Sequence, residues 1–189
     1  MGKGCEQMSD AMKSAGLVLA GGRSSRMGRD KADLEVGGQT LLARAVALLE
    51  TAGATRVYVA GRTDAENGLA DRLEYAGPAV AVLDACRVLL ADGFTHALVM
   101  PVDMPLMNAD ALKALMDEGN VAAAYATEPL PFFVSLEAAS TLETQPVSLR
   151  RLLSDLGAAQ IAKPPDDLIF VNANTPEEWE QIRQQLETD

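Results

Sequence analysis

Positive charge is concentrated in one short stretch of this chain. Four of the 16 basic residues fall within nine positions, just after the glycine pair Gly21 and Gly22. Glycines let a backbone approach a ligand closely and can direct consecutive N–H groups at an anion. The glycine pair alone would also suit an ordinary turn with exposed arginines, but the clustered cations favour phosphate binding. These cations are Arg23, Arg26, Arg29 and Lys31.

A carboxylate follows a second apolar segment. Asp103 lies in the sequence Pro-Val-Asp-Met-Pro, directly after the buried strand predicted for residues 96–100. Carboxylate oxygens are hard ligands that suit Mg²⁺, with water and phosphate oxygens completing the coordination shell. The alternative is that Asp103 ends the strand or caps the helix that begins near Asn108. The residues alone leave both interpretations open.

Two asparagines mark a third polar segment near the end of the chain. Thr175 and Pro176 are typical of an N-cap and the first residue of a terminal helix, with acids in its first turn. That interpretation accounts for the start of the helix. It leaves Asn172 and Asn174 unexplained.

Apolar strands and amphipathic helices alternate along the chain with short connections, which predicts an α/β fold with a mainly parallel sheet and helices on both faces. In such sheets ligands bind at the carboxyl ends of strands, near the point where strand order reverses. The polar segments after Ala20, Met100 and Val171 should therefore meet at one edge. Predicted strands are 16–20, 56–60, 96–100, 121–125, 132–135 and 169–171, and residues 33–36 alternate before a turn at 37–38. Predicted helices are 40–53, 79–93, 109–119, 136–143, 148–156 and 176–186, with 64–75 helical in part.

Size and composition limit the possible functions. The chain has 189 residues, 48% of them hydrophobic, which suits one domain at 15–189 behind a flexible leader at 1–14. A net charge of −11 argues against nucleic acid and anionic membranes as partners. The polar start and the lack of a long apolar run predict a cytoplasmic protein. Two cysteines and one histidine, His96, give no disulfide framework, zinc spacing or Ser-His-Asp pattern, and His96 is expected to be structural.

Residues 19–31 read LAGGRSSRMGRDK, which resembles the signature LAGGxSxRMGxDK of the nucleotidyltransferases related to molybdenum cofactor guanylyltransferase. The resemblance runs from about Gly16 to the C-terminal helix. It implies a Rossmann-like three-layer α/β/α fold that joins a nucleoside monophosphate to a phosphorylated pterin cofactor and releases pyrophosphate. It further implies Mg²⁺ as cofactor, GTP or CTP as donor, and molybdoenzyme-maturation proteins as partners.

The resemblance also assigns roles at the first loop. The backbone of Leu19, Ala20, Gly21 and Gly22 would contact the nucleotide. Arg26 would neutralise the β- and γ-phosphates. Lys31 would lie by the α-phosphate, where charge increases in the transition state, in keeping with phosphoryl transfer by positioning and charge neutralisation.

The remaining roles are implied in the same way. Asp103 matches the position of the family's metal aspartate. Asn172 and Asn174 match an N-x-N-T-P segment beside the metal and the phosphates. Asp71 and Gly77 match an aspartate and a Gly-Pro pair that contact the nucleoside, although Asp71 would also suit a solvated helix surface.

Departures from the family pattern leave the base and the acceptor open. Ala81 replaces the second glycine of GPLAG, and Ala60 begins the segment where guanylyltransferases tend to place an asparagine near the base. Residues 128–133 match the acceptor segment only loosely. Arg150 and Arg151 would suit either a solvated surface or the pterin's phosphate.

Three alternatives to guanylyl transfer follow from the sequence. One is transfer of a cytidylyl or other nucleotidyl group to a phosphorylated cofactor precursor. Another is a nucleotide-binding regulatory protein without turnover, which the altered segment at 77–81 suggests. The third, a sugar-nucleotide pyrophosphorylase, is disfavoured because the short chain leaves no room for a sugar-binding domain.

Overall fold

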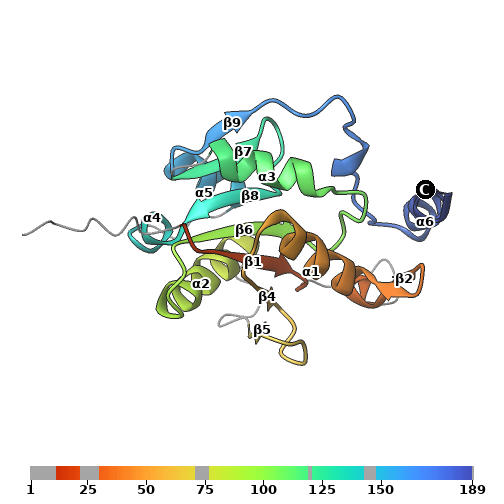
Figure 1. The fold of residues 1–189 in the computed structure, drawn as a ribbon, viewed down its shortest axis with the longest axis horizontal. Coiled ribbons are helices and arrows are strands. Elements are labelled where there is room, and N and C mark those ends of the chain that lie inside the picture. The colour runs from red at the N-terminus through yellow and green to blue at the C-terminus, as the bar shows by residue number, and fades with distance from the viewer. Residues whose placement is uncertain (1–11, 22–29, 71–76, 119–120, 143–147, 189) are drawn as a thin grey trace, which may run out of the picture.

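A seven-stranded sheet forms the centre of the molecule, in the order β5-β4-β1-β6-β8-β7-β9 (Figure 1). The computed structural model describes residues 12–21, 30–70, 77–118, 121–142 and 148–188. Strand β8 runs antiparallel to β6 and β7, and the other neighbouring pairs are parallel. The predicted mainly parallel sheet is confirmed. Its strands are β1 (Ser14–Leu19), β4 (Arg56–Ala60), β5 (Gly68–Leu69), β6 (His96–Pro101), β7 (Ala122–Tyr125), β8 (Phe132–Ser135) and β9 (Ala159–Ile161).

Helices cover both faces of this sheet and bury two separate apolar cores. Leu49 of α1 and Leu115 of α3 belong to the core on one face. Leu89 of α2, Leu136 of α4 and Leu152 of α5 belong to the core on the other. The result is the expected three-layer α/β/α arrangement. The helices are α1 (Leu41–Ala52), α2 (Pro78–Ala91), α3 (Ala109–Glu118), α4 (Leu136–Ser140), α5 (Leu149–Asp155) and α6 (Pro176–Thr188).

The first helix shows how local sequence sets the boundaries of an element. Thr40 caps α1, because its Oγ1 accepts a hydrogen bond from the Ala43 amide at 3.1 Å. Gly53 ends the helix in the left-handed region at φ 116°, where glycine carries no Cβ penalty. Both boundaries match the sequence prediction. In the same way Asn108 Oδ1 accepts from the Ala111 amide at 2.9 Å at the start of α3.

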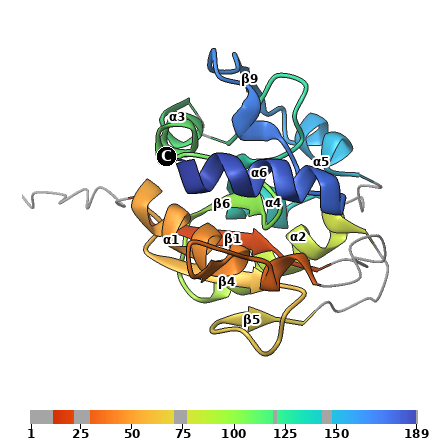
Figure 2. The same ribbon diagram turned by 90° about the vertical axis from the view of Figure 1, so that its right-hand side faces the viewer.

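Two short 3-10 helices and a hairpin complete the described chain. The first 3-10 helix, η1 (Lys31–Asp33), precedes a hairpin of β2 (Glu35–Val36) and β3 (Gln39–Thr40). The second, η2 (Leu168–Phe170), precedes α6. Helix α6 contacts β2 and lies in front of the main sheet in Figure 2, on the side where β1 ends. Among the described residues no helix has the length and apolar character needed to cross a membrane.

Two predicted segments differ from the described structure, and one strand was not predicted. Residues 64–70 form turns and the short edge strand β5 without a helix, and the rest of the segment predicted to be helical in part, 71–75, lies outside the described residues. Asn67 joins this segment to β4, because its Nδ2 donates to the carbonyl of Val57 and its own carbonyl accepts from the Val59 amide. The strand predicted at 169–171 is instead part of the 3-10 helix η2, because a short apolar run is compatible with either a strand or a helix. Strand β9 was missed because it pairs only with β7 and is largely exposed, so it carries no apolar pattern.

Candidate active site

The carboxyl ends of the three central strands lie level with one another. Leu19 of β1 pairs with Ala60 of β4 on one side and with Pro101 of β6 on the other. The chain continues from β1 to β4 on one side and then crosses to β6 on the other, so strand order reverses between β1 and β6. This is the point where open α/β sheets bind ligands.

A cleft of about 360 Å³ opens at this point. Its lining includes three residues from the start of the predicted glycine loop (residues 19–31), together with Lys31 from its end and with Asp103 and Asn172. The three loops that the sequence predicted to meet therefore do meet. The remaining lining residues are Asp30, Pro78, Pro101, Val102, Met104, Glu128, Pro129 and Leu130, and the three from the glycine loop are Leu19, Ala20 and Gly21.

One ammonium group joins the polar residues of all three loops. The Nζ of Lys31 donates to Asp103 Oδ2 and to Asn174 Oδ1, each at 2.7 Å. The side chains of Lys31 and Asp103 are only 16% and 19% exposed. Partial burial weakens solvent screening, so the attraction between the two charges is stronger than that of a surface pair.

Backbone hydrogen bonds hold the aspartate loop between its two neighbours. The Val102 amide donates to the carbonyl of Leu19 at 3.1 Å, which continues the β1–β6 pairing past the end of β6. The Ala173 amide donates to the carbonyl of Asp103 at 2.9 Å. Because Ala173 is fully buried, this contact fixes the two asparagines beside it against the aspartate loop.

A capping box orients the asparagine segment at the start of α6. Glu178 Oε2 accepts from the amides of Asn174 and Thr175 at 2.9 and 3.0 Å, and Thr175 Oγ1 accepts from the Glu178 amide at 3.2 Å. This reciprocal arrangement satisfies the free amides at the helix start. The cap and the cleft are thus parts of one local structure, with Thr175 serving the helix and Asn174 facing Lys31.

The oxygen atoms of the cleft suit a hard divalent cation. Asp103 and Asn174 already direct oxygens at a single cation, the Lys31 ammonium, and Asn172 lines the same cleft. Within the described residues no group of three or more His, Cys, Asp or Glu side chains could hold a metal. Mg²⁺ commonly uses one or two carboxylates and takes its remaining ligands from water and substrate phosphates. The residues present therefore fit a hard divalent cation that takes its remaining ligands from water and from a phosphate-bearing ligand.

Gly61, which was not predicted to be a site residue, packs against the glycine loop. It follows β4 with φ 85°, and a Cβ there would overlap the Cα and N atoms of Gly21. The Ala20 amide also donates to the carbonyl of Ala60 at 3.0 Å. The backbone of the glycine loop therefore packs directly against the end of β4. Any side chain at position 61 would prevent this contact.

Arg62 is a second residue that sequence analysis missed. Its guanidinium binds Asp30 and Asp33 at 3.0 and 3.1 Å, on either side of Lys31, and Asp64 at 2.9 Å. Hydrogen bonding to Asp64, followed by that to Asp33, raises the pKa of Arg62 above its ordinary value. Since Asp30 Oδ1 also accepts from the Ala32 amide, Arg62 fixes the turn that carries Lys31. The only sequence signal is a cation at a strand end in an acidic chain.

The other predicted residues fall at the rim or outside the described chain. Gly77 is the N-cap of α2 with φ 89° and is exposed, and its neighbour Pro78 lines the cleft. Gly22, Arg26 and Asp71 lie outside the described residues.

Among the described residues, neither His96 nor Cys86 lines this cleft. His96 lies at the opposite end of β6, where its ring stacks on Phe133 at a centroid distance of 5.1 Å. Cys86 is buried in α2, and burial raises the pKa of its thiol to about 12. His96 therefore lies away from the cleft and packs on the sheet.

The fold and the cleft define an α/β nucleotidyltransferase, and comparison with known proteins identifies its family. Residues 16–164 match the family described as the MobA-like NTP transferase domain. The chain is 38% identical over 178 residues to a molybdenum cofactor guanylyltransferase of Xanthomonas euvesicatoria pv. vesicatoria (strain 85-10), covering 88% of this chain and 93% of that protein. The chain belongs to the MobA-like NTP transferase family.

Solved structures with low sequence identity share the fold. Molybdopterin-guanine dinucleotide biosynthesis protein A from Archaeoglobus fulgidus superposes with a TM-score of 0.68 at 19% identity, covering 93% of this chain and 100% of that one. A Mycobacterium tuberculosis H37Rv protein in complex with manganese superposes with a TM-score of 0.58 at 17% identity, covering 91% and 98%. These similarities confirm the three-layer architecture.

Proposed function

We propose that this enzyme transfers GMP from GTP to the terminal phosphate of molybdenum-molybdopterin and releases pyrophosphate. The observation that carries the proposal is the convergence of Lys31, Asp103 and Asn174 at the carboxyl end of β1, in a chain 38% identical to a molybdenum cofactor guanylyltransferase. The reaction needs no side-chain nucleophile, because the acceptor phosphate is already ionised at neutral pH. An acceptor oxygen attacks the α-phosphorus while the bond to the bridging oxygen of pyrophosphate breaks.

The chain's own groups supply positioning and charge. The backbone of Ala20 and Gly21 orients the triphosphate, and Lys31 donates to the oxygens on which charge increases during transfer. Asp103, Asn172 and Asn174 would hold Mg²⁺, which when bound neutralises phosphate charge. The Lys31–Asp103 pair keeps both charges compensated before the substrate enters. Binding of the nucleotide then exchanges this internal pair for contacts with phosphate.

A neighbouring cleft is suited to the acceptor. It has a volume of about 480 Å³ and shares Glu128 and Pro129 with the nucleotide cleft. Arg150 lies on its wall and donates to the carbonyl of Thr127 at 2.7 Å. A guanidinium there can bind an anionic group of the acceptor. We therefore place the pterin in this cleft, with its phosphate directed past Glu128 towards Lys31.

Pyrophosphate release tests the proposal directly. The purified chain is incubated with Mg²⁺, molybdenum-molybdopterin and either GTP or CTP, and the dinucleotide product is identified by mass spectrometry. Guanylyl transfer predicts release with GTP that depends on the acceptor. Asp103→Asn should abolish most of it, whereas Asp117→Asn, an exposed carboxylate on α3, should not. Absence of product with every acceptor and nucleotide would contradict an enzymatic role.

Cytidylyl transfer is the second candidate. It is favoured by the residues at the end of β4, where Ala60 is buried and Gly61 has no side chain. Neither can donate or accept a side-chain hydrogen bond at a base edge. Turnover with CTP that exceeds turnover with GTP would replace the first candidate by the second.

A further inference from the structure

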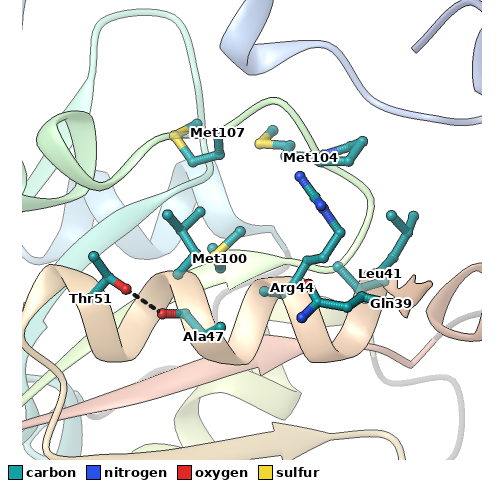
Figure 3. Close-up of a pocket in the computed structure, with 12 residues that line it drawn as sticks. Gln39, Leu41, Arg44, Ala47, Thr51, Met100, Met104 and Met107 are labelled. Carbon is teal, nitrogen blue, oxygen red and sulfur yellow. Dashed lines mark hydrogen bonds between the residues drawn. The ribbon is translucent and has the colours of Figure 1, made fainter. Parts of the chain in front are cut away.

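A second pocket lies on the far side of the loop that carries Asp103. It has a volume of about 250 Å³ and is formed by α1 and by the chain from Met100 to Met107. Three methionine side chains line one wall of it (Figure 3), and Leu48 adds to its apolar lining. Methionine is unbranched and polarisable, and such surfaces adapt to ligands of different shapes. The methionines are Met100, Met104 and Met107.

Arg44 is the single charged residue among those that line this pocket. Figure 3 shows its side chain rising from α1 towards Met104 on the opposite wall. Its Nε is buried and has no hydrogen-bond partner. Across the described part of the chain no carboxylate pairs with Arg44, although the protein carries 27 acidic residues and a net charge of −11. A buried donor without a partner is unfavourable, so a guanidinium with no carboxylate partner beside apolar walls favours an anion.

The other polar groups of the lining do not satisfy Arg44. The Thr51 hydroxyl donates to the carbonyl of Ala47 within α1 at 2.8 Å, a contact drawn in Figure 3. Gln39 belongs to β3 at the mouth of the pocket and is exposed. The pocket thus combines an apolar wall with one guanidinium that has no carboxylate partner among the described residues. Its volume suits a small organic molecule.

We propose that this pocket is an effector site for a small carboxylate with an apolar body. The carboxylate accepts hydrogen bonds from the Arg44 guanidinium, whose fork geometry matches two oxygens, and the apolar body packs on the methionines. A volume just below the usual range for drug-sized ligands restricts the occupant to a short chain or a single ring.

The position of this pocket makes an effect on the nucleotide cleft possible. Val102 and Met104 line both the pocket and the cleft, and Asp103 lies between them. A ligand that shifts the wall shared by the two sites must shift the loop that carries the Asp103 carboxylate. Coupling between two such sites is reciprocal and typically amounts to about 5–150-fold in affinity.

Binding is tested by titrating the protein with hexanoate while following the methyl resonances of labelled methionines by NMR. Saturable shifts of Met104 and Met107 are expected, with much weaker effects of acetate, inorganic phosphate and the neutral analogue hexanamide. Arg44→Gln should weaken hexanoate binding by about tenfold or more. Arg87→Gln is the matched control, because Arg87 lies on α2 and pairs with Asp84. Equal binding of hexanoate and hexanamide, or unchanged binding by Arg44→Gln, would overturn the proposal.

A second variant separates loss of the site from loss of the fold. Ala47 is exposed and lines the pocket, so Ala47→Leu narrows the pocket while leaving Arg44 in place. It should also weaken hexanoate binding, with a melting temperature close to that of the unmodified protein. Unchanged hexanoate affinity in this variant would place the ligand elsewhere.

The effector role is tested by measuring the dissociation constant of Mg²⁺-GTP with and without saturating hexanoate. A change of about fivefold or more is expected in the unmodified protein and none in Arg44→Gln. This measurement rests on the proposed function, whereas the methyl titration does not, so the two can fail separately. Hexanoate binding with no change in GTP affinity would overturn the effector role.

Discussion

The backbone of Gly61 lies against the backbone of Gly21 so closely that the two loops meet without an intervening side chain. One glycine follows β4 and the other follows β1, the adjacent strand. The loop that follows β1 is therefore positioned by a neighbouring strand end as well as by its own sequence. Position 61 therefore supports the loop that lines the cleft, although Gly61 does not line the cleft itself.

Replacing Gly61 by alanine should lower both stability and GTP affinity, a larger effect than backbone strain alone would cause. The positive φ costs about 1–3 kcal/mol for a non-glycine residue, and overlap with Gly21 adds to that cost. Gly93→Ala is the matched control, because Gly93 has φ 81° but open space around its Cβ position. We expect Gly61→Ala to lower both the melting temperature and the GTP affinity, and Gly93→Ala to lower only the former. Equal GTP affinities in the two variants would argue against support of the nucleotide loop by β4.

Removing the cleft charges should lower turnover without unfolding the chain. Lys31→Ala and Asp103→Ala should each reduce kcat by about 10²-fold or more, in line with lost electrostatic stabilisation. Because the two side chains form one ion pair, their effects on stability should be non-additive. A double-mutant cycle by urea denaturation measures this coupling, and circular dichroism checks the fold. Near-normal turnover of Asp103→Ala at limiting Mg²⁺ would contradict the metal assignment.

Arg62 should act as a positioning residue for Lys31. Its ion pairs with Asp30 and Asp33 hold the turn on both sides of that lysine, so Arg62→Gln should lower kcat/KM by about tenfold. Partial rescue by Arg62→Lys is expected, since a single ammonium can keep one of the pairs. Arg183→Gln on α6 removes comparable surface pairs with Glu180 and Glu187 and should leave kcat/KM unchanged. Equal losses in the glutamine and lysine variants would indicate a purely structural role.

Alkaline pH should destabilise the protein through Cys86. Burial raises the pKa of its thiol from 9.0 to about 12, so the native state keeps a proton that the unfolded chain releases. The free energy of unfolding should therefore fall as pH rises from about 9 towards 12. Other groups also titrate there, so the measured quantity is the difference between the unmodified protein and Cys86→Ala in urea denaturation. That difference should shrink with rising pH, and a constant difference would exclude the thiol as its cause.

Local sequence predicted the parts of this structure that local chemistry determines. Thr40 and Gly53 bound α1 because a hydroxyl cap and a left-handed glycine act within a few residues. The same holds for Asn108 at α3 and for Thr175 at α6. The failures have two causes. The edge strands β5 and β9 depend on pairing with distant strands, and the short apolar run at η2 is compatible with either a strand or a helix.

The candidate site divides in the same way. The glycine loop and Asp103 were identified by motif, and their meeting was predicted from the rule for carboxyl ends of strands. Arg62 and Gly61 were missed because their roles depend on β4 lying beside β1, and strand order is not encoded in local patterns. Arg44 was not predicted, because only the three-dimensional structure shows that its Nε is buried without a hydrogen-bond partner.

The hydrogen bond from Lys31 to Asn174 joins residues 143 positions apart in the chain. During synthesis the lysine emerges early, whereas its asparagine partner emerges only when most of the polypeptide is complete. A nascent chain can therefore pair β1 with β4 and β6 long before it can assemble a competent catalytic centre. Shortening the protein at residue 164, where the match to the family domain ends, would remove this last contribution while retaining every strand of the sheet.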